Sequence, residues 1–414
     1  MILLKKPELL APAGDFESLK MAINFGADAV YIGGKDFSMR ASPANFSLTQ
    51  LVLAGELAHK NGVKLYLACN ILPRNEELAS LPAFFENARQ AGIDGLIISD
   101  LGVLELARRH APEVEIHIST QAGVVNFGAA NAFFSLGAKR VVLARELSLR
   151  EIEVIRQNTP DGLAIEAFVH GAMCVSFSGR CLLSEYLTGR DANRGECAQP
   201  CRWNYTLMEQ KRSGEYFPVF EDEQGTHILN AKDLCMLPYI PELVKSGITS
   251  LKIEGRAKSA YYTAVVTNAY RMAIDAYFEQ DEHYSFDKRL LDEVEKVSHR
   301  DYCTGFYFGP LQKGQIYGED SYLRSYDIIA VVEDCKTDLA ICRQRNPFSA
   351  CDAVEALIPG SLGQPVIIEK IYDENGKNLD CAPHPDMKVL LKTDIPLLPG
   401  TILRKAVVKN CINK

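Results

Sequence analysis

The stretch GADAVYIGG at residues 26–34 introduces the pattern that decides the fold. The same arrangement, a glycine with two short residues and then an apolar run, returns as GIDGLIISD from Gly92, GAKRVVLAR from Gly137 and GITSLKIEG from Gly247. Each copy follows an amphipathic stretch. A glycine just past a helix supplies a left-handed cap, and the apolar run is typical of a buried parallel strand. The repeated unit is therefore helix, glycine turn and strand.

Four further strands are expected between these units, which brings the total to eight. They are ELLAPA from Glu8, KLYLACN from Lys64, EIHIST from Glu115 and LAIEAFV from Leu163. Ser47, and Ser148 with Glu151, have the form of helix N-caps. Eight alternating units predict an α/β fold of the TIM-type (β/α)8 barrel. An open doubly wound sheet is the alternative, although no G-x-G-x-x-G follows the first strand.

The pattern of residue types changes near Ser325, where short runs rich in β-branched residues alternate with turns that contain Gly, Pro and Asn. Such a pattern is typical of a small all-β domain. We expect a TIM-like barrel over residues 1–308, a Cys-rich insertion after its seventh strand at 171–235, a linker at 309–324 and a small β-barrel domain at 325–414.

The 414 residues carry a net charge of −8, which argues against nonspecific coating of nucleic acid but allows a local basic patch. The N-terminus does not have the form of a signal peptide, and no apolar run approaches 18 residues. We therefore expect a cytoplasmic protein that does not cross a membrane. Structural disulfides are rare in the cytoplasm, so a cluster among the twelve cysteines points to metal binding or catalysis.

Polar residues follow the predicted strands, at the end of a TIM barrel where active sites lie. They are Asp15, Asn70, Asp100, Thr120, Gln121, Arg145, Glu146, Glu166, His170, Glu254 and Arg256. Any one of them alone could be a helix cap or a loop hydrogen bond. From their positions at strand ends, we take Glu166, His170 and Glu254 as candidate acid–base residues. Arg145 and Arg256 are candidates to hold a carboxylate or a phosphate.

The insertion concentrates thiols and arginines. Its cysteines are Cys174, Cys181, Cys197 and Cys201, with Cys235 further on. Thiolates are soft ligands, and this spacing lacks the C-x2-C of zinc ribbons, so an iron–sulfur cluster, a zinc ion and unliganded thiols all stay open. The arginines are Arg180, Arg190, Arg194 and Arg202, followed by Trp203. They could bind phosphates and bases or form local ion pairs; Arg180, between two candidate ligands, is a third candidate for substrate binding.

The segment EAFVHGAMCVSFSGRCLLS at 166–184 resembles the signature of the collagenase-like peptidase family thirty-two, and ELLAPAGD, CRWNY, LKIEGR and TGFYFG resemble further landmarks of it. The chain is most similar to the tRNA hydroxylation branch, which makes 5-hydroxyuridine at the wobble position with prephenate. Other branches hydroxylate ribosomal RNA cytidine or support ubiquinone hydroxylation as paired paralogues.

The resemblance implies an RNA-modifying hydroxylation enzyme with a [4Fe-4S] cluster on Cys174, Cys181, Cys197 and Cys235, with Cys201 as an alternative to Cys197. It implies tRNA and prephenate as partners, and the family also allows a paralogous subunit. The alternatives are a true peptidase, a non-catalytic iron–sulfur scaffold that works beside a paralogue, and a zinc-stabilised RNA-binding protein.

Overall fold

The computed structural model describes residues 5–39, 45–174, 176–203, 207–208, 216–217, 220–222, 225–227, 232–280, 283–309, 323–336 and 338–407. Eight parallel strands form one sheet in the order β13-β1-β2-β3-β4-β5-β6-β7, and β13 also pairs with β7. The sheet is therefore a closed barrel, which confirms the predicted TIM-type fold. The strands are β1 Glu8–Pro12, β2 Ala29–Gly33, β3 Lys64–Cys69, β4 Gly95–Ile98, β5 Glu115–Ile118, β6 Arg140–Val142, β7 Ala164–Ala172 and β13 Ser250–Ile253.

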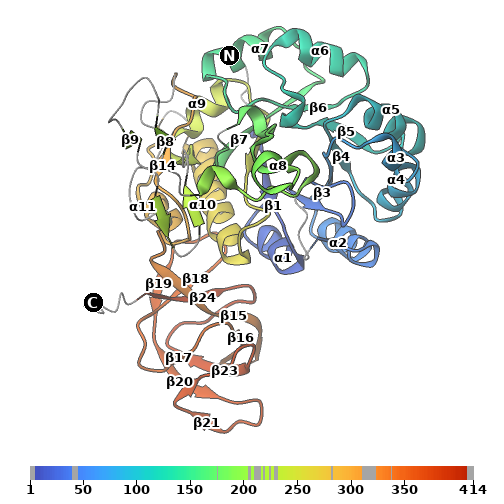
Figure 1. Ribbon diagram of the computed structural model, residues 1–414. Helices are drawn as coiled ribbons and strands as arrows, with labels where there is room; N and C mark the ends of the chain where they lie inside the picture. The colour runs from blue at the N-terminus through green and yellow to red at the C-terminus, as the bar shows by residue number, and fades with distance from the viewer. Residues whose placement is uncertain are drawn as a thin grey trace.

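Helices surround the strands on the outside (Figure 1). They are α1 Phe16–Asn24, α2 Leu48–Lys60, α3 Asn75–Leu78, α4 Leu81–Gln90, α5 Leu101–His110, α6 Phe127–Ser135, α7 Leu149–Gln157, α9 Ile240–Lys245, α10 Ala260–Gln280 and α11 Arg289–Val294. Ser47 and Ser148 begin α2 and α7 with the predicted capping boxes. The main apolar core fills the layer between the helices and the outer faces of the strands.

A long insertion separates β7 from β13 at the carboxyl end of the barrel, and α8 of this insertion lies in front of the strands in Figure 1. Its elements are η2 Phe177–Gly179, α8 Leu183–Thr188, η3 Ala192–Arg194, η4 Pro200–Arg202, β8 Leu207–Met208, β9 Tyr216–Phe217, β10 Phe220–Asp222, β11 Gly225–His227 and β12 Asp233–Cys235. β12 returns antiparallel to β7 and pairs on its other side with β14 Tyr302–Cys303. Short helices η1 Thr120–Ala122 and η5 Leu237–Tyr239 complete the barrel domain.

The C-terminal part of the chain is an antiparallel all-β domain with its own core, and it lies below the barrel in Figure 1. Its strands are β15 Tyr326–Lys336, β16 Leu339–Gln344, β17 Phe348–Ser349, β18 Val354–Leu357, β19 Gln364–Val366, β20 Ile368–Tyr372, β21 Asn378–Leu379, β22 Cys381–Ala382, β23 Lys388–Thr393 and β24 Ile402–Ala406. The all-β prediction is confirmed. Within the described residues, the eight-stranded sheet runs from β19 to β21 without a closing pair. Most of the predicted linker at 309–324 lies outside the described residues.

A buried ion cluster joins the two domains. Arg404 of β24 has no solvent exposure, and its Nη2 lies 2.7 Å from Oε2 of Glu293 in α11 and 2.8 Å from Oε2 of Glu355 in β18. Lys296, just past α11, contacts the same two carboxylates at 2.9 Å each. The C-terminal domain is thus joined to the barrel by ion pairs that centre on a fully buried guanidinium. No described helix is long and apolar enough to cross a membrane.

Candidate active site at the barrel mouth

A cavity of about 170 Å³ lies between the carboxyl ends of the barrel strands and the insertion. Its floor and walls come from the strands, and its cover comes from η2, α8 and the loop after η3. The residues that line it are Tyr31, Met39, Ala68, Asn70, Ile97, Ser119, Thr120, Gln121, Val142, Arg145, Phe168, Ala172, Met173, Cys174, Ser178, Gly179, Cys181, Leu183, Ala192, Cys197, Gln199, Pro200, Cys201, Lys252, Glu254 and Arg256. The strand-end polar residues and the cysteine cluster therefore meet in one place.

Polar contacts tie the cover to the barrel. Arg194 forms two hydrogen bonds of 2.7 Å with the carboxylate of Glu77 in α3. The backbone N–H and the hydroxyl of Ser178 donate to Glu146, at 2.7 and 2.8 Å. Ser178 has a φ of 47°, in the left-handed region that a residue with a side chain rarely adopts. The loop is thus held in a defined shape at some conformational cost, which is common at functional sites.

Four of the five candidate thiols line this cavity: Cys174, Cys181, Cys197 and Cys201. The Sγ of Cys181 accepts the backbone N–H of Leu183 at 3.3 Å, and the Sγ of Cys197 accepts that of Gln199 at 3.4 Å. Hydrogen bonds to the sulfurs are one of the means by which proteins tune iron–sulfur clusters. Among the described residues, no three His, Cys, Asp or Glu side chains are already grouped as ligands of one metal ion. None of the cysteines in the described ranges forms a disulfide.

The fifth candidate, Cys235, lies elsewhere. It is buried in β12, where it pairs with His170 of β7, and it is not among the cavity residues. Burial raises the pKa of the Cys235 thiol to about 12. In this structure Cys201, and not Cys235, lines the same cavity as Cys174, Cys181 and Cys197.

Two arginines line the wall of the cavity, as their strand-end positions predicted. The guanidinium of Arg145 lies over the ring of Phe168 at 3.8 Å, donates to the carbonyl of Ala172 at 2.8 Å, and lies 3.3 Å from Oε2 of Glu254. Nη1 of Arg256 donates to the hydroxyl of Ser38 at 2.6 Å. A Cβ on Gly33 would lie 2.1 Å from that nitrogen, so glycine at this position makes room for Arg256.

The floor of the cavity carries a third cation, Lys252, which is only 4% exposed. Its Nζ lies 2.7 Å from Oε1 of Glu166 and 4.5 Å from the centre of the Tyr31 ring. Glu166 lies one layer deeper in the barrel, where its other oxygen accepts from Arg140 at 2.8 Å. Burial alone would raise the pKa of Glu166, but the charges of Lys252 and Arg140 outweigh it and hold the pKa at about 2.

Replacing Glu166 with glutamine is expected to lower the free energy of unfolding by about 3 to 5 kcal/mol at pH 7, because two buried cations lose a shared counter-charge. A carboxylate with a lowered pKa contributes stability above its unfolded pKa of 4.5, and this contribution is lost as the pH falls toward 2. The difference between the two proteins should therefore shrink below pH 4.5. Denaturant unfolding at several pH values measures it, and a pH-independent difference would contradict this account.

Two amide side chains complete the wall opposite the cations. Nδ2 of Asn70 donates to Oε1 of Gln121 at 2.8 Å, and the hydroxyl of Ser119 donates to the same oxygen at 2.9 Å. The amide groups are thereby oriented by buried neighbours. Together with Glu254, they give the cavity donors and acceptors for a polar planar ligand, such as the edge of a nucleobase.

Besides Cys235, three predicted site residues do not line the cavity. Glu166 lies below the floor, as described. His170 is buried on the outer side of β7 between Tyr262, Tyr270 and Tyr302. Burial lowers the pKa of His170 to about 3, so it is neutral. Arg180 is exposed to solvent on the outside of the cover. Glu166 and His170 were expected in the polar ring at the mouth of the barrel, and that placement was wrong. The role of Arg180 in substrate binding stays a prediction.

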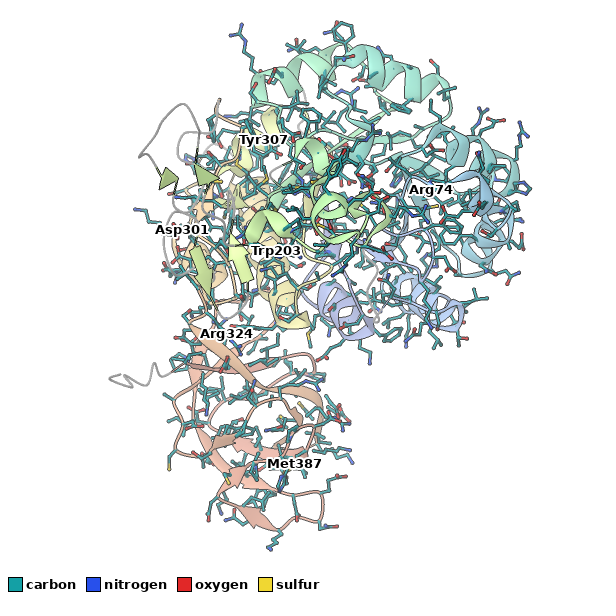
Figure 2. All side chains as sticks on the ribbon, viewed as in Figure 1. Arg74, Trp203, Asp301, Tyr307, Arg324 and Met387 are labelled. Atoms are coloured by element: carbon teal, nitrogen blue, oxygen red, sulfur yellow. The ribbon has the colours of Figure 1, made fainter. Side chains whose placement is uncertain are left out.

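Other members of the predicted polar ring have local roles. The carboxylates of Asp15 and Asp100 accept backbone N–H groups as N-caps of α1 and α5, and Glu146 holds Ser178. Sequence reasoning missed Lys252, although a lysine two residues before Glu254 in a buried strand has the same inward parity. In Figure 2, Trp203 marks the end of η4 and Arg74 the start of α3, on either side of the cover in this view.

Comparison with known proteins gives a consistent result over both domains. A model of peptidase family U32 matches residues 14–316, and a model of the peptidase family U32 C-terminal domain matches residues 324–404. The tRNA hydroxylation protein P1 of Bacillus subtilis (strain 168) is 40% identical over 98% of this chain and 96% of its own length. The tRNA hydroxylation protein P of Escherichia coli (strain K12) is 37% identical over 91% and 92%. The 23S rRNA 5-hydroxycytidine C2501 synthase of the same strain is 36% identical over 85% of this chain and 52% of its own length.

Proposed function

Because the chain belongs to peptidase family U32, we propose that it is an RNA-modifying enzyme that hydroxylates tRNA. The observation that carries this proposal is one cavity with four thiols in its cover and three cations around its floor and wall. The most similar relatives described above are named for tRNA hydroxylation and match nearly the whole chain.

We propose further that the product is 5-hydroxyuridine at the wobble position, and that prephenate is the small donor molecule. Prephenate is a dicarboxylate, and the cavity offers Arg145, Arg256 and Lys252 as partners for two carboxylates. The ring of Phe168 beside Arg145 supplies an apolar surface for the carbon skeleton. The amides of Asn70 and Gln121 suit the edge of the uracil, and Glu254, the carboxylate among the described cavity residues, would accept a proton from it.

We propose that a [4Fe-4S] cluster binds to the thiols in the cover. Cys174, Cys181, Cys197 and Cys201 provide four sulfurs around one cavity, and two of them already accept backbone N–H groups. When bound, such a cluster supplies one-electron chemistry next to the donor and the base. The residues of the chain hold both molecules against it, and the cover restricts the access of water. We propose Cys201 as the fourth ligand in place of Cys235.

A peptidase activity is less well supported by this cavity. A cysteine peptidase needs a histidine within hydrogen-bond reach of its thiol. None of the described residues that line the cavity is a histidine. The nearest family-signature histidine, His170, is buried among tyrosines on the far side of β7.

Anaerobic purification followed by iron and zinc assays and a visible spectrum tests the cluster. We expect a brown protein with about four irons per chain. The activity is tested by expressing the chain in a bacterium that lacks its own tRNA hydroxylation and by measuring tRNA nucleosides with mass spectrometry. Return of 5-hydroxyuridine supports the proposal. A colourless zinc protein, or cleavage of gelatin without any change in tRNA nucleosides, would overturn it.

A further inference from the structure

The outer surface of the cover carries large apolar side chains that no other part of the described chain buries. Tyr186 is 81% exposed, Phe177 and Leu182 are 53% exposed each, and Leu187 is 46% exposed. All four belong to one short segment, η2 through α8. Single exposed apolar residues are ordinary on protein surfaces, but four within eleven positions form a patch that calls for a partner.

This patch is the outer side of the wall that encloses the cavity. Along residues 177–183, Ser178, Gly179, Cys181 and Leu183 line the cavity, while the side chains of Phe177, Arg180 and Leu182 are exposed. Whatever molecule rests on the patch is therefore separated from the cavity by the thickness of a single loop. The hydrogen bonds from Ser178 to Glu146 fix the loop, so its outward side chains are presented in a constant arrangement.

Positive charge accompanies the aromatic rings. Arg180 lies between Phe177 and Leu182, and Arg190 follows α8; both are exposed. Neither forms an ion pair with a residue that the structure describes, whereas Arg194 of the same segment is fully engaged with Glu77. Exposed aromatic rings interleaved with unpaired guanidinium groups match the chemistry of unstacked bases and their phosphates.

We infer that the patch of Phe177, Leu182, Tyr186 and Leu187, with Arg180 and Arg190, is the surface on which the single-stranded loop of the RNA substrate stacks. The inference rests on the proposed function. Bases that flank the target would stack on Tyr186 and Phe177, the arginines would contact phosphates, and the target base would turn past the rim into the cavity. Arg180, which does not line the cavity, thereby gains a role on its outer side.

The test uses the purified holoprotein and an unmodified tRNA transcript as the probe. Tyr186→Ala and Phe177→Ala are each expected to raise the Kd for the transcript about five- to 150-fold, the range of one lost base stack. Tyr186→Phe should restore binding, because stacking needs the ring and not the hydroxyl. Val154→Ala, which removes a 45% exposed side chain from α7, is the matched control and should bind as the wild type does.

The contribution of the two arginines is measured by the salt dependence of transcript binding. Arg180→Gln and Arg190→Gln should each reduce the slope of log K against log salt by about 0.7, the value for one phosphate contact on a single strand. Unchanged transcript affinity in Tyr186→Ala and Phe177→Ala, with a wild type that binds and hydroxylates RNA, would overturn the inference and leave the proposed function standing. A wild-type protein that neither binds nor hydroxylates RNA would overturn both this inference and the proposed function.

Discussion

Replacing Cys181 with alanine is expected to remove the iron and to reduce tRNA hydroxylation by more than about 100-fold, because even outer-shell partners of metal ligands cost 10- to 100-fold when they are lost. Cys181 lines the cavity and accepts a backbone N–H through its sulfur, so it has the surroundings of a ligand thiolate. Iron content, the visible spectrum and tRNA nucleosides measure the result. Cys351→Ala, at an exposed thiol of the C-terminal domain, is the matched control and should retain both iron and activity.

The same assay separates the two candidates for the fourth ligand. Cys201→Ala should lose iron as Cys181→Ala does, since Cys201 lines the cavity. Cys235→Ala should keep its iron and lose only some stability, since this thiol is buried in β12 beside β7 and does not line the cavity. The opposite pattern, with iron lost from Cys235→Ala and kept in Cys201→Ala, would show that the ligand set implied by the sequence is the right one.

Lys252→Met is expected to lower the rate of hydroxylation by about 10- to 150-fold at subsaturating donor concentration. This range corresponds to the loss of one hydrogen bond between the donor and a charged group. Methionine removes the cation from the cavity floor and keeps most of the volume. The fold should survive, because Glu166 keeps Arg140 as its counter-charge at 2.8 Å. The change should appear in the dependence of the rate on prephenate concentration, and the thermal unfolding curve checks the fold.

Two further variants make this result specific. Lys64→Met removes an exposed lysine at the amino end of β3, on the side of the barrel away from the cavity, and should hydroxylate normally. Lys252→Arg restores a charge and should recover part of the activity. Equal losses in Lys64→Met and Lys252→Met, or an unchanged donor dependence in Lys252→Met, would contradict a role for Lys252 in holding the donor.

The barrel could be predicted from the sequence because four strands are apolar runs that start just after a helix-ending glycine, and four further apolar runs lie between them. Those signals are local, and together they located the eight strands. The inward or outward direction of a side chain near a strand end depends instead on pairing. The register of β7 against β13 shifts between Lys252 and Ile253, so that Ile253 pairs with His170 and skips Val169. This irregularity turns His170 outward, and nothing in the spacing of the residues indicates it.

The remaining differences in the site have similar causes. Glu166 was expected at the strand end, but β7 continues to Ala172, and this leaves the carboxylate deep in the barrel. Arg180 lies in a loop that is held by a hydrogen bond from Ser178 to Glu146, a residue distant in sequence. This contact decides which residues of the loop face the cavity and which face solvent. By contrast, Arg145, Glu254 and Arg256 directly follow short strands, and their positions at the mouth were predictable.

Arg404 affects how freely the two domains can move relative to each other. A guanidinium with no exposure is costly to bury, and only the simultaneous approach of Glu293 from the barrel and Glu355 from the β domain offsets that cost. A small tilt of one domain against the other would separate the charges before water could replace them. Hinge bending, the usual freedom of two domains on one chain, is therefore suppressed here. The ion cluster therefore favours one orientation of the C-terminal domain relative to α11 of the barrel.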